Sequence, residues 1–295
     1  MKKIIRVGSR DSVLAIIQAQ IVMSAVREIN PAIELELVKI KTSGDKILHK
    51  NLDDIGGKGL FIKELEQALM DGNVDISVHS YKDMPCEETA GLPVVALSKR
   101  EAPFDVLVLP KDTGVLDNSK PVGSSSKRRS VQFAGLYDGF ETKGVRGNVP
   151  TRLSKLDNGE YAALILAQAG LNRLSLQGRI SRIFTIDEMI PSASQGILAV
   201  QGRQGEDYTY LEKFHCRESG IVSRAERQFL KMLGGGCSSP VAVFGKLFNR
   251  ELLLTGMYVD PSGHVETGKI SGDAERPELT GETLAMQLKT RAEKR

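Results

Sequence analysis

The sequence predicts an α/β protein in which two hinged α/β units are followed by a small α+β unit with a three-stranded sheet. Short apolar strands alternate with helical patterns as far as residue 200, which favours largely parallel sheets. Two joints divide the chain, at 98–103 and 191–196, as in two-lobed binding folds. The expected domains are therefore 1–98 together with 196–215, then 103–192, and finally 217–295.

The first unit contains the clearest strand of the chain. Val74, Ile76 and Val78 alternate with polar residues, and Pro85 closes the polar stretch that follows them. Asp11 or Ser12 is expected to cap the first helix. The other strands of this unit are expected at 4–8, 33–40 and 94–97, with a return strand at 197–200, and a second helix at 60–70.

The second unit is expected to begin with a strand at 105–109. Its further elements are a loop and helix start at 123–129, a helix at 151–158, a buried strand at 162–167 and a helical segment that carries Arg173. The third unit is expected to contain a helix at roughly 218–233, strands at 241–247, 251–258 and 264–271, and a closing helix near 280–293.

Composition excludes several classes of protein. The 295 residues are 41% hydrophobic and 26% charged, with a net charge of only +3, no Trp and few aromatic residues, which argues against nucleic-acid binding. No apolar run approaches a membrane span, and charges interrupt the N-terminal stretch where a secretion signal would need an apolar core, so a cytoplasmic protein is expected. The three cysteines have no metal-ligand spacing, so no metal site and no disulfide framework is predicted.

Cations recur at the junctions between strands and helices. They are Arg10, Lys58, Lys82, Arg128, Arg129, Arg146, Arg152 and Arg173. Any one of them could be an ordinary solvated surface residue, but their shared placement predicts a cleft that binds carboxylate or phosphate groups.

Asp83 lies among these cations, in the polar stretch that also contains His79, Ser80 and Lys82 after the strand at 74–78. Ligands usually bind at the carboxyl ends of such strands, although an ordinary polar loop is the alternative.

Cys237 lies in the glycine-rich loop 234–239. A thiolate near arginines would have a lowered pKa and could act as a nucleophile, and a small buried cysteine is the alternative. Cys86 and Cys216 lack such surroundings and are expected to be small buried residues.

These motifs together resemble one family. The segments that carry the resemblance are 8–12 (GSRDS), 43–45 (SGD), 56–61 (GGKGLF), 79–85 (HSYKDMP), 124–129 (SSSKRR), 146–149 (RGNV) and 235–237 (GGC), in order over nearly the whole chain. They are similar to the hydroxymethylbilane synthases, also called porphobilinogen deaminases. The glycine motifs are weak individually, whereas the Lys-Asp, Arg-Arg, Arg-Gly-Asn-Val and Gly-Gly-Cys segments are specific together.

The resemblance implies two domains like those of a periplasmic binding protein, joined by a double-crossover hinge, and a third domain. It implies a transferase that condenses four porphobilinogen molecules head to tail onto a dipyrromethane cofactor, releasing ammonia and then, by hydrolysis, hydroxymethylbilane for haem biosynthesis. The cofactor would be joined by a thioether to Cys237. The implied partner is porphobilinogen alone, with no nucleic acid and no membrane, and the expected state is a monomer.

The resemblance also assigns roles to residues. Asp83 matches the catalytic carboxylate, which would stabilise the cation left by ammonia loss and transfer protons. Cofactor binding is implied for Cys237, Lys82, Asp83, Ser126, Arg128, Arg129, Arg146 and Gly147. Substrate binding is implied for Arg10, Ser12, Gln18, Lys58, Phe61, Ser80, Arg146, Arg152, Arg173 and Gln195.

A second interpretation is a hinged protein that binds or senses a small anion without catalysis, because a fold does not determine a function. Cys237 and Asp83 argue against it, since a simple anion receptor needs neither a thiolate nor a carboxylate among its cations.

Overall fold

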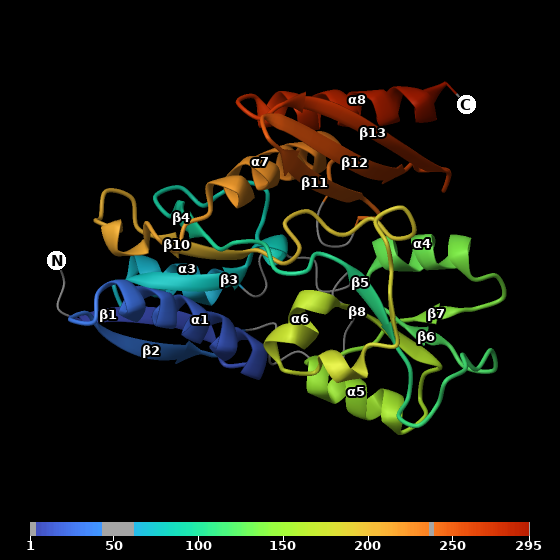
Figure 1. The fold of residues 1–295 in the computed structure, drawn as a ribbon, viewed down its shortest axis with the longest axis horizontal. Coiled ribbons are helices and arrows are strands. Elements are labelled where there is room, and N and C mark those ends of the chain that lie inside the picture. Colours follow the sequence, from blue (N-terminus) through green and yellow to red (C-terminus); the bar gives the residue numbers. More distant parts are fainter. Residues whose placement is uncertain (1–3, 43–61, 236–238, 295) are drawn as a thin grey trace. The chain divides into compact units, whose positions relative to one another are not determined.

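The computed structural model describes residues 4–42, 62–235 and 239–294. The chain forms two compact units, whose helices and strands are labelled in Figure 1. The first unit comprises Met1–Glu101 and Ile197–Gly220, and the second comprises Ala102–Gly196 and Ile221–Arg295. The chain thus leaves the first unit after Glu101, returns to it at Ile197 and leaves it again after Gly220. The expected division into three domains stays a prediction, although each expected domain has a sheet of its own.

The first unit is built on a five-stranded sheet with the order β2-β1-β3-β10-β4. Its strands are β1 (Ile4–Arg10), β2 (Glu34–Ile40), β3 (Ile76–Ser80), β4 (Val94–Leu97) and β10 (Leu198–Gly202). β1 runs parallel to β2 and β3, whereas β10 runs antiparallel to β3 and β4. Four of the five strands thus point the same way, which agrees with the expected largely parallel sheet. β10 alone is reversed in this sheet, because it enters from the returning chain and not through a β-α-β connection.

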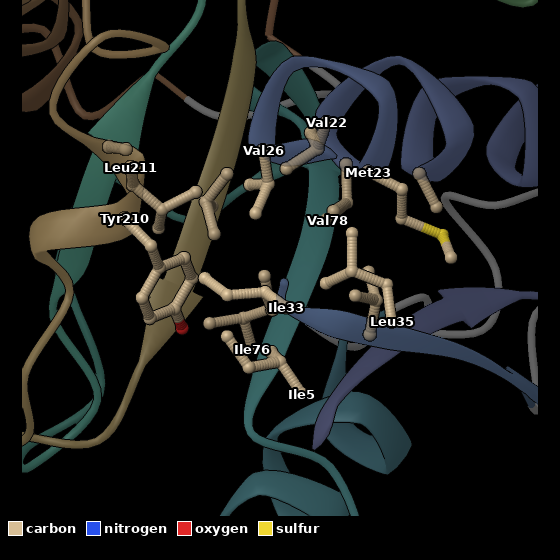
Figure 2. Close-up of a cluster of buried hydrophobic side chains, with 14 residues drawn as sticks. Ile5, Val22, Met23, Val26, Ile33, Leu35, Ile76, Val78, Tyr210 and Leu211 are labelled. Carbon is tan, nitrogen blue, oxygen red and sulfur yellow. The ribbon is translucent and has the colours of Figure 1, made fainter. Parts of the chain in front are cut away.

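Apolar side chains from the strands and from α1 (Val13–Ile29) form the core of the first unit, shown in Figure 2. Ile5, Ile76 and Val78 of the sheet pack with Val22 and Val26 of the helix. Helix α1 begins after Ser12, whose side chain accepts a hydrogen bond from the Ala15 backbone N–H at 3.3 Å. The cap expected from the sequence is confirmed in Ser12, and it fixes where β1 gives way to the helix. A second helix, α3 (Lys63–Met70), follows in the described chain.

The second unit contains a five-stranded sheet with the order β7-β6-β8-β5-β9. Its strands are β5 (Asp105–Val108), β6 (Val122–Gly123), β7 (Thr142–Lys143), β8 (Ala163–Ala167) and β9 (Arg182–Ile183). β6 is parallel to β7 and β8, and β5 is antiparallel to β8 and β9. Four of its strands again point the same way and β5 is reversed, which agrees with the largely parallel sheet that was expected. Its helices are α4 (Lys127–Leu136), α5 (Val149–Asp157) and α6 (Gln168–Arg173).

The C-terminal part is α+β, as the sequence predicts. The antiparallel strands β11 (Ala242–Phe248), β12 (Glu251–Val259) and β13 (Val265–Asp273) form a three-stranded sheet, and α8 (Pro277–Glu293) packs against β12 and β13. Helix α7 (Arg217–Met232) precedes the sheet. The fully buried carboxylate of Glu226 in α7 accepts hydrogen bonds from the backbone N–H groups of Ser194 and Gly245, both at 2.6 Å. This carboxylate joins the C-terminal sheet to the segment that leaves the second unit.

No helix in the described part of the chain has the length and apolar character needed to span a bilayer.

Candidate functional site

The first unit presents its candidate residues at one edge of its sheet. Because β1, β2 and β3 are parallel, their carboxyl ends lie at the same edge. Arg10 ends β1, Ser12 caps the helix after it, and Ser80 ends β3. The structure therefore places Arg10, Ser12 and Ser80 close to the segment that contains Asp83.

Asp83 lies in a single 3₁₀ turn, Tyr81–Asp83, directly after β3. Its side chain is exposed, and among the described residues its carboxylate makes no hydrogen bond and no ion pair. The turn is fixed to the rest of the unit by Tyr81. This residue is buried, and its backbone N–H donates to the carbonyl of Ile197 at 3.0 Å. Lys82, beside Asp83, is half-buried. The fixed turn thus exposes the Asp83 carboxylate, which makes no hydrogen bond or ion pair with the described residues.

Gln18 joins helix α1 to the end of β3. Its side chain is buried, and its Nε2 donates a hydrogen bond to the Ser80 Oγ at 2.8 Å. The two predicted substrate-binding residues therefore contact each other, and Ser12 uses its Oγ to cap α1. These polar atoms hold the strand end in place before any ligand is present.

His79 is a buried strand residue, which corrects its expected place in the polar stretch after the strand. It is 6% exposed in β3, and its Nε2 has no hydrogen-bond partner among the described residues. The pKa of His79 is lowered to about 4, chiefly by burial; the nearby Gln201 side chain opposes this shift and the positive charge of Arg10 adds to it. His79 is thus neutral at physiological pH and belongs to the interior.

We expect this burial to make the protein less stable in acid. The ordinary pKa of 6.5 applies to the unfolded chain, so between pH 6.5 and about 4 the unfolded chain binds a proton that the folded chain does not. The contribution of neutral His79 to the free energy of unfolding is fully present above pH 6.5. It falls as the pH drops toward 4, and the loss is about 2–3 kcal/mol at pH 4.5. Urea unfolding of the wild type and of His79→Gln at a series of pH values measures this loss of stability. Parallel stability curves for the two chains would contradict the prediction.

The second unit presents a matching set of loops. The strands β6, β7 and β8 are parallel, so the segments that follow them, 124–126, 144–148 and 168–173, lie at one edge of the second sheet. The Ser125 Oγ donates to the Val145 carbonyl at 2.7 Å and accepts from the Val145 N–H at 3.0 Å, which joins the first two loops. Ser126 stands at the N-terminus of α4 and is half-buried.

Arg146, Gly147 and Arg152 lie together in the second of these loops and in the helix after it. Gly147 has a φ of +110°, and a Cβ there would lie 2.7 Å from the Thr151 side chain, so this position requires glycine. The Arg152 Nε donates to the Gly147 carbonyl at 2.8 Å. Both arginines are half-buried.

Two of the predicted cofactor-binding arginines are buried, and a residue that the sequence reasoning missed holds them. Arg128 and Arg129 begin α4, and both guanidinium groups contact the carboxylate of Asp105, at 2.6 and 2.7 Å. Burial by itself would raise the pKa of Asp105, but the two guanidinium groups outweigh it and hold the pKa of this carboxyl well below its usual range. The only signal in the sequence was an acidic residue at the start of an otherwise apolar strand.

The remaining predicted residues of the second unit lie near its exit segment. The Arg173 Nη2 donates to the Gly196 carbonyl at 2.6 Å. Gln195 is fully buried, and its Nε2 donates to the Pro103 carbonyl and to Asp105 Oδ1, at 2.7 and 3.0 Å. Lys58, Phe61 and Cys237 lie outside the described residues.

In each unit, the cationic side chains at the strand ends suit the carboxylate groups of a ligand. The loops of each unit supply arginine or lysine side chains at the strand ends, the chemistry that binds carboxylate groups. Within residues 4–42, 62–235 and 239–294, no group of three His, Cys, Asp or Glu side chains is placed to hold a metal ion. A dipyrromethane, whose pyrroles carry acetate and propionate groups, suits such a set of cations.

Comparison with known proteins gives matches over nearly the whole chain. The family described as "Porphobilinogen deaminase, dipyromethane cofactor binding domain" matches residues 5–210, and "Porphobilinogen deaminase, C-terminal domain" matches residues 221–290. The chain is 52% identical to the porphobilinogen deaminase of Ruminiclostridium cellulolyticum, over 98% of this chain and 99% of the relative. It is 54% identical to that of Acetivibrio thermocellus, over 96% of this chain and 97% of the relative.

Among solved structures, the periplasmic aliphatic sulphonate binding protein SsuA from Escherichia coli aligns with a TM-score of 0.38 and 12% identity, over 78% of this chain and 70% of that one.

Proposed function

The chain belongs to the porphobilinogen deaminase family, and we propose that Asp83 is the carboxylate that catalyses its reaction. The protein is a transferase of tetrapyrrole biosynthesis that condenses four porphobilinogen molecules onto a dipyrromethane primer, releases ammonia at each addition and finally frees hydroxymethylbilane by hydrolysis. Membership of this family does not favour the alternative of an anion-binding protein without catalysis. The primer, when bound, supplies the pyrrole carbon to which the next unit is added.

The proposal for Asp83 rests on one observation: its exposed carboxylate makes no hydrogen bond with the described residues and lies on a turn that is fixed to the sheet. Loss of ammonia from porphobilinogen requires a proton on the leaving amine and leaves positive charge on the pyrrole. A carboxylate can hold that proton in transit and stabilise the cation electrostatically. Asp83 is exposed, and the buried Tyr81 and the Gln18–Ser80 hydrogen bond fix the strand end from which it projects. The strand-end residues Arg10, Ser12, Ser80 and Lys82 are cations or hydroxyl groups, which cannot take this role.

The cations bind the carboxylates of the primer and of the growing chain. We assign Lys82, Ser126, Arg128, Arg146 and the backbone of Gly147 to the cofactor, and Arg10, Arg152 and Arg173 to the substrate. Guanidinium groups suit this task because they bind carboxylate groups in a bidentate manner. Cys237 is the proposed attachment point, since its thiolate can form the thioether. Lys58 and Phe61 remain proposed substrate-binding residues on the basis of the resemblance. The proposed setting is the cytoplasm, and the proposed state is a monomer without nucleic-acid or membrane partners.

The intact mass of the purified chain under denaturing conditions tests this function. We expect a mass excess equal to two pyrrole units, and digestion should place it on the peptide that contains Cys237. A chain purified without the excess should acquire it on incubation with porphobilinogen. If no adduct forms after that incubation, and no ammonia is released, the assignment of the reaction to this chain is wrong.

A further inference from the structure

The carboxylate of Asp105 is the centre of a buried cluster in the second unit. Asp105 begins β5 and is fully buried. Its Oδ2 accepts from the Arg128 Nη1 at 2.6 Å, and its Oδ1 accepts from the Arg129 Nε and Nη2 at 3.0 and 2.7 Å and from the Gln195 Nε2 at 3.0 Å. Three residues expected to bind cofactor or substrate therefore converge on one acidic residue that had no assigned role.

The two arginines are used differently by this cluster. Every nitrogen of the Arg129 guanidinium already donates, since its Nη1 bonds the Ile165 carbonyl at 3.1 Å while Nε and Nη2 bond Asp105. Arg128 donates through Nη1 alone, to Asp105 and to the Ile190 carbonyl at 2.7 Å. Its Nε and Nη2 have no partner among the described residues. Arg129 is therefore an internal support, and one edge of Arg128 remains able to bind a ligand.

The charges of the cluster also indicate that Arg128 can bind a ligand. Two neighbouring guanidinium groups in a buried site repel each other unless an anion lies between them, and a buried charge without a partner is strongly destabilising. Asp105 neutralises one of the two positive charges and leaves the cluster with a net charge of +1. That remaining charge can be matched by a single ligand carboxylate.

Gln195 fixes this cluster to both ends of the segment Ala102–Gly196 of the second unit. Its Nε2 bonds Asp105 and also the Pro103 carbonyl at 2.7 Å. Pro103 lies where the chain enters the unit, and Gln195 where the chain leaves it. The position of the carboxylate is thus determined by the strand, by the helix and by both connecting segments.

We propose that Asp105 is a positioning residue for cofactor binding, which holds Arg129 as a support and leaves the Nε and Nη2 edge of Arg128 to bind a carboxylate of the dipyrromethane. The inference rests on the proposed function, because it takes the ligand from that function. It differs from the direct role that the resemblance implies for Arg129.

The test is the rate at which the chain without cofactor gains its covalent adduct from porphobilinogen, followed by intact mass, together with its melting temperature. The matched control is Asp75→Asn. Asp75 is also a buried carboxylate between two arginines, Arg6 and Arg203, at 3.2 and 3.3 Å, but neither arginine is a predicted ligand. Both substitutions should lower the melting temperature. We expect only Asp105→Asn to slow adduct formation, by about tenfold or more, and to raise the porphobilinogen concentration that gives half the maximal rate.

A second comparison shows whether Asp105 acts through Arg128. In an Arg128→Met chain, adding Asp105→Asn should slow adduct formation by less than about twofold, because the effects of coupled residues do not add. If Asp105→Asn alone does not fold, Asp105→Asn with Arg129→Gln removes both partners of one ion pair and serves in its place. The proposal is overturned if Asp105→Asn gains the adduct as fast as the wild type, or if Asp75→Asn slows it equally. Failure of the wild type itself to gain an adduct would refute the proposed function.

Discussion

Asp83→Ala is expected to reduce the steady-state rate of hydroxymethylbilane formation by about 10³-fold or more, because it removes both the proton-transfer group and the stabilising charge. The fold should remain intact. The Asp83 side chain is exposed and makes no hydrogen bond with any described residue, so its loss leaves no buried partner unsatisfied. The melting temperature should therefore stay within the range of other surface substitutions. Asp83→Asn should be similarly slow, since an amide keeps the shape but carries neither the charge nor the proton.

Glu88→Ala is the matched control for Asp83→Ala. Glu88 is an exposed carboxylate five residues further along the chain and lies outside the 3₁₀ turn. We expect it to keep wild-type turnover, which would show that the loss in Asp83→Ala is specific to that position and not a general effect of surface charge. Equal turnover in the two variants would contradict the assignment of Asp83.

Cys237→Ser is expected to abolish the covalent adduct. A thiolate is a far stronger nucleophile than a serine hydroxyl at neutral pH, so the thioether cannot be replaced by an ether under the same conditions. After incubation with porphobilinogen, the mass of the denatured variant should equal the mass calculated from its sequence. Turnover should fall with it, because no primer is retained from one cycle to the next.

The two other cysteines provide the controls for Cys237→Ser. Cys86 and Cys216 are half-buried, where small buried side chains were expected. Cys86→Ser and Cys216→Ser should each retain the full adduct. An adduct that persists in Cys237→Ser and disappears in either control would move the attachment point to that cysteine.

The local sequence determined a large part of this protein. Alternating apolar residues predicted β3, the hydroxyl of Ser12 predicted the start of α1, and the polar residues after the strand predicted the position of Asp83. These features depend on residues that are close in the chain, because strand alternation and helix capping are local interactions. The family resemblance was likewise carried by short segments with their own chemistry, and the comparisons confirm it.

Only the tertiary structure decided the direction of the returning strands and the partners of buried charges. β10 and β5 run antiparallel to their neighbours because of the route by which the chain enters each sheet, and no local pattern records that route. Asp105 contacts side chains 23, 24 and 90 residues away, so its role was invisible until those residues came together. The same applies to His79, whose neutral state follows from burial under distant strands. The sequence therefore predicted where the exposed functional side chains lie. Packing of distant segments decided which charged groups are paired inside the protein and which can still bind a ligand.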